Sequence, residues 1–327
     1  MKTHTLILIG LMLALSGALW AQYQIGDAWL VDQGAGQIIR IMAGNQIDPQ
    51  AISGFKQPVV AAVNPKEWSL WIADSAAQVI VKFDADKKQV ATIEGIKTPS
   101  SISIDPRDGS IWVGMENSVA KYSADGKRLF KMGGVIEAYV SVNPKDGTCW
   151  VTDSGKSGNP PGRVLKLSPD GSQLLVVDKG FTEPKGVTVN PTDGSVWVVD
   201  SQGNQVVRLD ANGRVVAKVQ GLNFPSSVSL NPKDGTAWIA DMQNGRLIKV
   251  DPNGKIIQEI SQQMCSSVGI MFPTFVTVDP NDGGIWVIDQ IIRQVLKFDA
   301  TGKPKIQIPR QILKRPSFVT VSYMEKR

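Results

Sequence analysis

Short apolar runs separated by polar turns recur along most of this chain. The stretch 186–219 shows the pattern most clearly, because it holds four runs of β-branched residues bounded by Gly, Pro, Asn and Asp. Runs of this length and alternation are typical of half-buried β-strands. The pattern predicts four strands, named A to D in chain order, at 186–189, 196–199, 205–209 and 215–219.

A tryptophan marks strand B of each such unit. It occurs seven times, at intervals of 38 to 48 residues. Periods of this size with four strands per unit are typical of β-propeller blades. We therefore predict an all-β fold, a single seven-bladed propeller of four-stranded antiparallel blades, with six blades as the alternative. The seven residues are Trp29, Trp71, Trp112, Trp150, Trp197, Trp238 and Trp286.

Two kinds of hairpin turn punctuate the units. An Asn-Pro or Asp-Pro turn lies between strands A and B, and an acidic turn ending in Gly lies between most C and D strands. The acidic turns lack the further carboxylates of a calcium loop, so we interpret them as hairpins.

The number of A–B turns predicts how the ring closes. There are six of them for seven tryptophans: residues 28–32 have no strand A before them, and residues 316–322 have a strand A pattern with no strand B after. We expect the C-terminal strand to complete the first blade, which would protect both free edges.

The repeated side chains of strand B have structural interpretations. One large aromatic residue per blade would fill the space between neighbouring twisted sheets. An Asp follows the tryptophan by three residues in six units, and Asp readily accepts hydrogen bonds from backbone N–H groups. We expect both residue types to be scaffold rather than site. The acidic residues are Asp32, Asp74, Asp153, Asp200, Asp241 and Asp289.

The N-terminus has the pattern of a secretory signal peptide. Lys2 precedes an almost wholly apolar run at 6–15, and cleavage sites follow at Ala18 and Ala21. The run is short for a membrane span. We predict a signal peptide at 1–21, a propeller domain at 22–327 with no membrane span, and an extracytoplasmic location, periplasmic or secreted.

Charge and cysteine content exclude few classes of function. The net charge is +5, and the basic residues are spread over the turns without a dense run, so we expect no nucleic-acid partner. Of the two cysteines, Cys149 precedes a tryptophan where other units carry small apolar residues, and Cys265 lies in a long inter-blade loop. We expect Cys149 to be a small buried residue and do not favour a disulfide between the two.

The stretch 193–210 resembles an NHL-type repeat. It contains Asp-Gly, a hydrophobic strand, Asp, a short loop with Asn and a strand ending near Arg and Asp, and 241–251 matches nearly as well. The resemblance covers almost all of 22–327 as seven NHL-like repeats. It places the chain broadly among NHL, gluconolactonase-like and streptogramin-lyase-like propellers, and it implies a fold without fixing an activity.

Histidine sets the chain apart from part of this group. The only one is His4, inside the predicted signal peptide, whereas the streptogramin-inactivating and amidating lyases depend on histidine. Resemblance to gluconolactonases implies one divalent cation held by Glu, Asp and Asn in the channel. We expect no cofactor; Ca²⁺ is the alternative that this resemblance implies, with Glu116, Asn117 and Glu137 as candidate ligands.

Departures from the repeat indicate where a ligand would bind. The loops at 154–162 and 261–273 are enlarged, and both belong to the face that carries the B–C and D–A loops. The regular pattern also breaks on three adjacent blades near that face, which is expected at functional sites. The candidate ligand-binding residues are Glu116, Glu137, Tyr139 and Lys185, with Phe275 and Phe318 as an apolar wall at the channel mouth.

We therefore expect an exported, non-enzymatic binding scaffold for a protein, a glycan or a small ligand, without catalytic residues. A Ca²⁺-dependent lactonase-like hydrolase and a structural or surface-assembly module are the alternatives. The sequence leaves the oligomeric state open.

Overall fold

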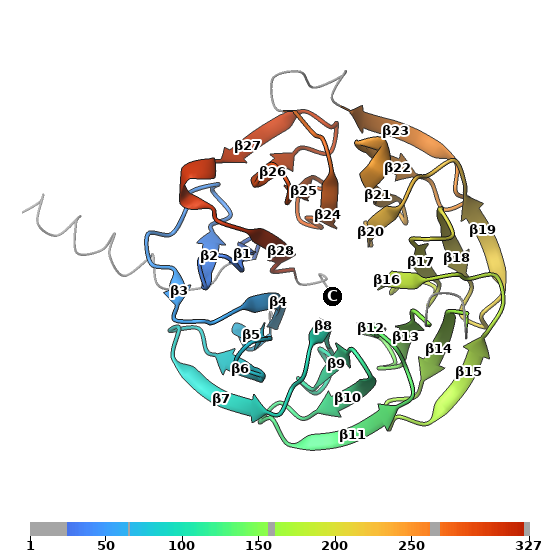
Figure 1. Cartoon of the computed structure of the whole chain (residues 1–327), viewed down its shortest axis with the longest axis horizontal. Helices are drawn as coiled ribbons and strands as arrows, with labels where there is room; N and C mark the ends of the chain where they lie inside the picture. The colour runs from blue at the N-terminus through green and yellow to red at the C-terminus, as the bar shows by residue number, and fades with distance from the viewer. Residues whose placement is uncertain (1–24, 65, 156–160, 262–268, 324–327) are drawn as a thin grey trace, which may run out of the picture.

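The computed structural model describes residues 25–64, 66–155, 161–261 and 269–323. Over these residues the chain forms seven four-stranded antiparallel sheets, arranged as blades around a central channel (Figure 1). The predicted seven-bladed, all-β propeller is confirmed. The predicted signal peptide at 1–21, Cys265 and parts of both enlarged loops lie outside the described residues.

Each blade runs from strand A beside the channel to strand D at the rim. The A strands, from blade 1 to blade 7, are β28 (Pro316–Val321), β4 (Pro58–Asn64), β8 (Pro99–Ile104), β12 (Tyr139–Val142), β16 (Pro184–Val189), β20 (Pro225–Leu230) and β24 (Pro273–Val278). The B strands are β1 (Ala28–Asp32), β5 (Ser69–Asp74), β9 (Ile111–Met115), β13 (Cys149–Asp153), β17 (Val196–Asp200), β21 (Ala237–Asp241) and β25 (Ile285–Asp289).

The outer half of each blade is built the same way. The C strands are β2 (Gln37–Ile41), β6 (Val79–Phe83), β10 (Ser118–Tyr122), β14 (Arg163–Leu167), β18 (Gln205–Leu209), β22 (Arg246–Val250) and β26 (Gln294–Phe298). The D strands are β3 (Ile52–Ser53), β7 (Gln89–Glu94), β11 (Arg128–Gly133), β15 (Gln173–Val177), β19 (Val215–Val219), β23 (Ile256–Ser261) and β27 (Pro304–Ile308). Short 3₁₀ turns lie at Met242–Asn244 and Arg310–Ile312.

The last strand closes the ring as predicted. β28 pairs antiparallel with β1, and Val319 lies opposite Leu30. The backbone N–H of Gly26 adds a 2.9 Å hydrogen bond to the carbonyl of Ser322. Blade 1 therefore combines the two ends of the described chain, which removes the open edge that a linear array would have.

Every blade repeats one cross-strand row. In blade 4, Ser141 on strand A lies opposite Trp150 on strand B, and Trp150 lies opposite Lys166 on strand C. All seven tryptophans are at most 2% exposed, which confirms their prediction as core residues. The residue opposite the tryptophan on strand C is always basic, a regularity that the sequence analysis missed. The basic residues are Arg40, Lys82, Lys121, Lys166, Arg208, Lys249 and Lys297.

Several of these cations tie one blade to the next. Lys166 Nζ donates a 3.0 Å hydrogen bond to the carbonyl of Ala211, in the C–D turn of the following blade. Three others donate in the same way, so the apolar tryptophan layer is backed by a polar contact between blades. These bonds join Lys82 to Ala124, Lys121 to Pro169 and Arg208 to Pro252.

The Asp at the end of strand B fixes the loop that leads into its own blade. Asp200 is fully buried and accepts hydrogen bonds from the backbone N–H groups of Thr182 and Glu183. The scaffold prediction holds for this residue, but its main partners lie in the D–A loop rather than in the B–C loop. This Asp therefore positions residues at the start of strand A.

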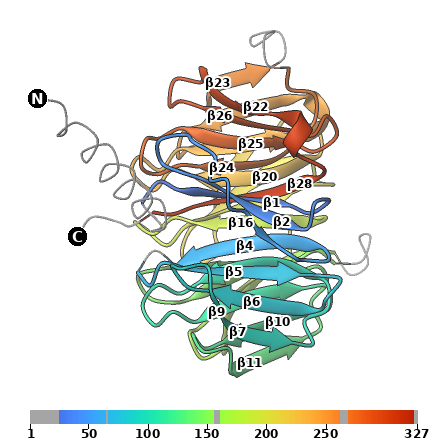
Figure 2. The ribbon, with the colours of Figure 1, turned by 90° about the vertical axis from the view of Figure 1, so that its left-hand side faces the viewer.

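The loops separate into two faces, seen edge-on in Figure 2. A–B and C–D turns lie on one face, called the turn face here. B–C and D–A loops lie on the other, called the loop face. Within the described ranges, no helix is long and apolar enough to cross a membrane.

Candidate functional site

The structure brings three of the predicted residues together on the loop face. Lys185 is the second residue of β16, and its Nζ lies 3.4 Å from Oε2 of Glu137 in the neighbouring D–A loop. Tyr139 begins β12, two residues after Glu137. Strands β12 and β16 are neighbouring inner strands, so the D–A loops of blades 4 and 5 end side by side. This proximity brings the side chains of Glu137, Tyr139 and Lys185 together.

A fourth residue, Glu183, was missed by the sequence analysis. Its Oε1 lies 3.2 Å from Lys185 Nζ, so Lys185 stands between two carboxylates. The other oxygen, Oε2, is buried and has no hydrogen-bond partner among the described residues. Glu183 replaces Gln57, Thr98, Phe224, Phe272 and Arg315, which precede the strand A proline in other blades. A carboxylate at this position of the repeat was the signal that could have found it.

Glu137 is held in an uncommon backbone conformation. Its φ is +48°, in the left-handed region that a non-glycine residue adopts at a cost of about 1 kcal/mol or more. Its N–H donates to the carbonyl of Glu116 at 2.7 Å, and Ser154 Oγ donates to its carbonyl at 3.2 Å. These bonds from blades 3 and 4 keep the strained residue in place, with its carboxylate directed to Lys185.

Glu116 and Asn117 occupy the B–C loop of blade 3 beside this cluster. Thr98 Oγ1 donates a 2.8 Å hydrogen bond to Glu116 Oε2. Asn117 is exposed, and its side chain makes no hydrogen bond to another described residue. With Glu116, the loop-face cluster comprises three carboxylates against one ammonium group. The cluster is defined as Glu116, Glu137, Tyr139, Glu183 and Lys185.

The electrostatics of the cluster keep both Lys185 and Tyr139 protonated. Burial alone would lower the pKa of Lys185, but the charge of Glu137, with Tyr139 and Glu183, outweighs it and raises that pKa. Burial raises the pKa of Tyr139 to about 12, and the negative charge of Glu137 adds to the shift. Near neutral pH, Lys185 is therefore a fixed cation and Tyr139 a neutral donor.

Phe275 and Phe318 form a separate apolar pair. Their ring centroids are 4.5 Å apart, on the neighbouring inner strands β24 and β28. They belong to blades 7 and 1, two blades and more from β16 in blade 5. The structure thus shows an aromatic contact on the inner strands, apart from the charged cluster.

The cluster does not fit the divalent cation that resemblance to gluconolactonases implies. Such an ion needs several convergent oxygen ligands. No group of three or more Asp, Glu, His or Cys side chains within the described residues is placed to hold a metal. Where Glu137 and Glu183 approach each other, the ammonium group of Lys185 already lies between them. A second cation there would be repelled by Lys185.

A larger cavity lies at the opposite end of the channel, on the turn face. Its volume is about 1010 Å³, and its wall comes from the A strands and the A–B turns. None of the candidate residues predicted from the sequence lines this cavity, because the turns on this face are short and uniform and gave no sign of a site. Regular turns around the axis nevertheless leave an open ring, into which the side chain of Tyr323 extends.

Cys149 belongs neither to the loop-face cluster nor to the wall of the turn-face cavity. It is a free, fully buried thiol on β13, as predicted for a small core residue. Burial raises its pKa well above the ordinary value, so the thiol is not ionised at neutral pH.

Comparisons with known proteins agree with the fold. Residues 141–275 match the family model described as SMP-30/Gluconolactonase/LRE-like region. A comparison with curated protein sequences found no match. The matched region runs from β12 to β24 and includes Lys185 and Glu183. The fold is a seven-bladed propeller, and the match over this part of the chain agrees with the resemblance to gluconolactonase-like propellers seen in the repeats.

Solved structures of low identity share the architecture. A functionally unknown protein from Desulfotomaculum acetoxidans DSM 771 is 16% identical, with a TM-score of 0.72 over 92% of this chain and 100% of that chain. A streptogramin B lyase is 17% identical, with a TM-score of 0.67 over 82% and 90%. A chain of a nidogen/laminin complex is 16% identical, with a TM-score of 0.60 over 91% and 98%. At these identities the likeness shows the fold alone.

Proposed function

We propose that this protein is a non-enzymatic binding scaffold whose loop face receives a basic group of a protein or peptide ligand. The observation that carries the proposal is Oε2 of Glu183, a buried carboxylate oxygen without a hydrogen-bond partner among the described residues. An unsatisfied buried acceptor is costly, by about 1–3 kcal/mol and more for a charged group. A cationic group bound at the neighbouring carboxylate of Glu137, which is accessible from solvent, would lower that cost through its charge.

The charge of the cluster supports a cationic ligand group. Two carboxylates, those of Glu137 and Glu183, flank a single ammonium group, and Glu137 is 42% exposed, so one carboxylate remains accessible from solvent. The whole chain is basic, with a net charge of +5. A cationic ligand is therefore attracted only by the local carboxylates of the cluster, and not by the charge of the protein as a whole.

The chemistry of the same residues argues against catalysis at this site. Lys185 is held protonated, and a protonated amine is neither a nucleophile nor a base. Tyr139 stays neutral up to strongly alkaline pH. Residues 22–327 contain no histidine, so no imidazole base is available within them.

Two further lines support the proposal. The N-terminal pattern around Lys2 and Ala21 favours export, so we place the scaffold outside the cytoplasm. A propeller with the same fold forms part of a nidogen/laminin complex, which shows that this architecture can serve protein binding in another protein.

Calorimetry with tetralysine tests the proposal directly. We expect the mature chain to bind it at low ionic strength, and we expect Glu183→Gln and Glu137→Gln each to weaken binding at least tenfold. Glu94→Gln is the matched control, since Glu94 is an exposed carboxylate on β7 at the rim. Tetraglutamate, used as the opposite-charge probe, should not bind.

Three results would overturn this function. Tetralysine that fails to bind, or that binds equally to all three variants, removes the cluster as the recognition site. Preference for tetraglutamate would make Lys185 the recognition group instead. Ca²⁺-dependent hydrolysis of a sugar lactone that is lost in Glu137→Gln would establish the lactonase alternative.

A further inference from the structure

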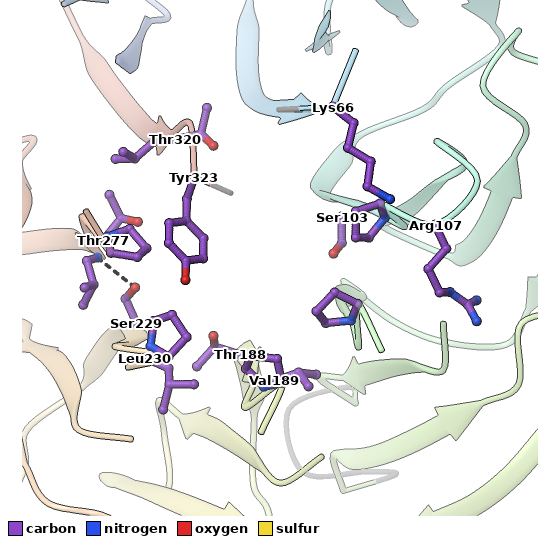
Figure 3. Close-up of a pocket in the computed structure, with 17 residues that line it drawn as sticks. Lys66, Ser103, Arg107, Thr188, Val189, Ser229, Leu230, Thr277, Thr320 and Tyr323 are labelled. Carbon is purple, nitrogen blue, oxygen red and sulfur yellow. Dashed lines mark hydrogen bonds between the residues drawn. The ribbon is translucent and has the colours of Figure 1, made fainter. Parts of the chain in front are cut away.

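The turn-face cavity is built from a repeated position of the inner strands. The residue opposite each tryptophan on strand A is Ser or Thr in six of the seven blades, with Ala62 as the exception. Five of these hydroxyl residues line the cavity of about 1010 Å³ (Figure 3). They are Ser103, Thr188, Ser229, Thr277 and Thr320.

The serine hydroxyls are oriented by the neighbouring blades. Ser103 Oγ accepts a 3.0 Å hydrogen bond from the N–H of Val142, and Ser229 Oγ accepts one of 2.9 Å from the N–H of Val278. An oxygen that accepts from a fixed backbone group leaves its own hydrogen available as a donor. These two serines therefore offer positioned O–H donors at the cavity wall.

The threonine hydroxyls of the wall have no such partner. Thr188, Thr277 and Thr320 make no side-chain hydrogen bond to any described residue, and all three are partly exposed to the channel. Figure 3 shows the hydroxyls of Thr188 and Thr277 turned to the cavity, with the ring of Tyr323 extending into it. Each of these hydroxyls can both donate and accept.

Charge is nearly absent from this wall. The lining includes no Asp or Glu among the described residues. Arg107 lines the cavity, but its guanidinium is paired with Asp105 at 2.7 Å and is directed away from the centre in Figure 3. Lys66 is exposed at the rim. The interior therefore presents hydroxyls without a fixed unpaired charge.

The remaining lining is apolar and rigid. The first proline of the A–B turns forms a collar around the opening, and Val189 and Leu230 complete the wall. Proline has a fixed φ, so this collar is preorganised. The collar residues are Pro106, Pro144, Pro191, Pro232 and Pro280.

We propose that the turn-face cavity binds an uncharged, hydroxyl-rich ligand, namely a neutral saccharide. Convergent groups that both donate and accept match sugar hydroxyls, and the proline collar offers apolar surface to the C–H faces of a sugar ring. The volume lies at the upper end of the range of about 300–1,000 Å³ for ligand pockets, which suits a short oligosaccharide. This site is independent of the loop-face cluster and lies at the other end of the channel.

Calorimetry of the mature chain with four neutral trisaccharides tests this site: maltotriose, cellotriose, mannotriose and triacetylchitotriose. The informative variant is Thr188→Val combined with Thr277→Val, because valine keeps the shape of threonine and removes the hydroxyl. Neither hydroxyl bonds to a described residue, so the fold should be unaffected. Thr92→Val on β7 is the matched control at the rim.

We expect at least one trisaccharide to bind, with affinity lowered at least tenfold by the double valine variant and unchanged by Thr92→Val. A chain that ends at Tyr323 should bind as well as the full chain. Failure of all four trisaccharides at millimolar concentration overturns the proposal, as does binding that the double variant leaves intact. Preferential binding of inorganic phosphate, lost in Lys66→Gln, would assign the cavity to anions instead.

The two proposals fail separately. The valine variants leave Glu137, Glu183 and Lys185 unchanged, so tetralysine binding should be the same in them as in the unmodified chain. Loss of both trisaccharide and tetralysine binding in the double valine variant would indicate a damaged fold, and circular dichroism would detect that damage.

Discussion

Lys121 Nζ lies 5.6 Å from the centroid of the Trp112 ring and at the same time donates a 2.8 Å hydrogen bond to the carbonyl of Pro169 in the next blade. One side chain thus joins the aromatic core of blade 3 to the C–D turn of blade 4. A cation over an aromatic face is attracted by the ring quadrupole, and burial strengthens that attraction. Only 5% of the Lys121 side chain is exposed.

Lys121→Met should therefore destabilise the propeller. The variant keeps most of the apolar contact with Trp112 but leaves the carbonyl of Pro169 without its donor. Loss of a bond from a charged group costs about 1.5–3 kcal/mol. We expect the free energy of unfolding in urea to fall by about that amount.

Lys249→Met is the matched control for this prediction. Lys249 lies opposite Trp238 at the same register position, yet its ammonium makes no hydrogen bond or ion pair with another described residue. We expect its loss to change the free energy of unfolding by less than about 0.5 kcal/mol. Equal effects of the two substitutions would show that the bond to Pro169 contributes nothing.

Tyr139 should ionise at about pH 12 rather than near its ordinary pKa of 10. The difference in absorbance at 295 nm between the unmodified chain and Tyr139→Phe isolates this one tyrosine. Because Glu137 contributes to the shift, Glu137→Gln should move the midpoint down. A difference curve centred near pH 10 would contradict the burial of the phenol.

The same shift predicts a dependence of stability on pH. The pKa of Tyr139 is raised in the folded state, so its contribution is complete below pH 10 and is lost as the pH rises to about 12. The free energy of unfolding should therefore fall more steeply between pH 10 and 12 in the unmodified chain than in Tyr139→Phe. Parallel curves for the two proteins would contradict the prediction.

Cys149 should be unreactive in the folded protein. It is completely buried on β13, and burial keeps the thiol protonated. In a Cys265→Ser background, a thiol reagent at pH 8 should label Cys149 only after addition of denaturant. Rapid labelling without denaturant would show that blade 4 opens locally.

Residues 316–323 should be required for a closed ring. Their removal exposes the inner edge of β1, which is otherwise paired with β28. An exposed edge strand pairs readily with other chains. We expect the shortened chain to associate or aggregate in size-exclusion chromatography, whereas a chain ending at Tyr323 should elute like the full-length protein.

The repeat pattern was enough to predict the architecture. Seven tryptophans at blade-sized intervals and six A–B turns led to seven blades and to closure by the C-terminal strand, and both predictions are confirmed. These features are local, because strand alternation and turn chemistry depend on residues close together in the chain.

The candidate residues were predicted with less success. Glu137, Tyr139 and Lys185 do meet on the loop face. The sequence indicated them because the repeat pattern is broken at these positions on adjacent blades. Glu183 was missed, although it lies two residues before Lys185, because its importance rests on a buried oxygen without a partner. Burial of a single atom depends on the packing of two blades and is not visible in a local pattern.

The sequence by itself determined the number of blades, the order of strands and the way the ring closes, because repeated short-range patterns encode all three. Only the tertiary structure decided what the ring encloses. The ammonium of Lys185 came to lie between two carboxylates, and a hydroxyl-lined cavity opened behind the uniform turns. Both arise from side chains far apart in the chain, whose separations are set by the radius and closure of the ring.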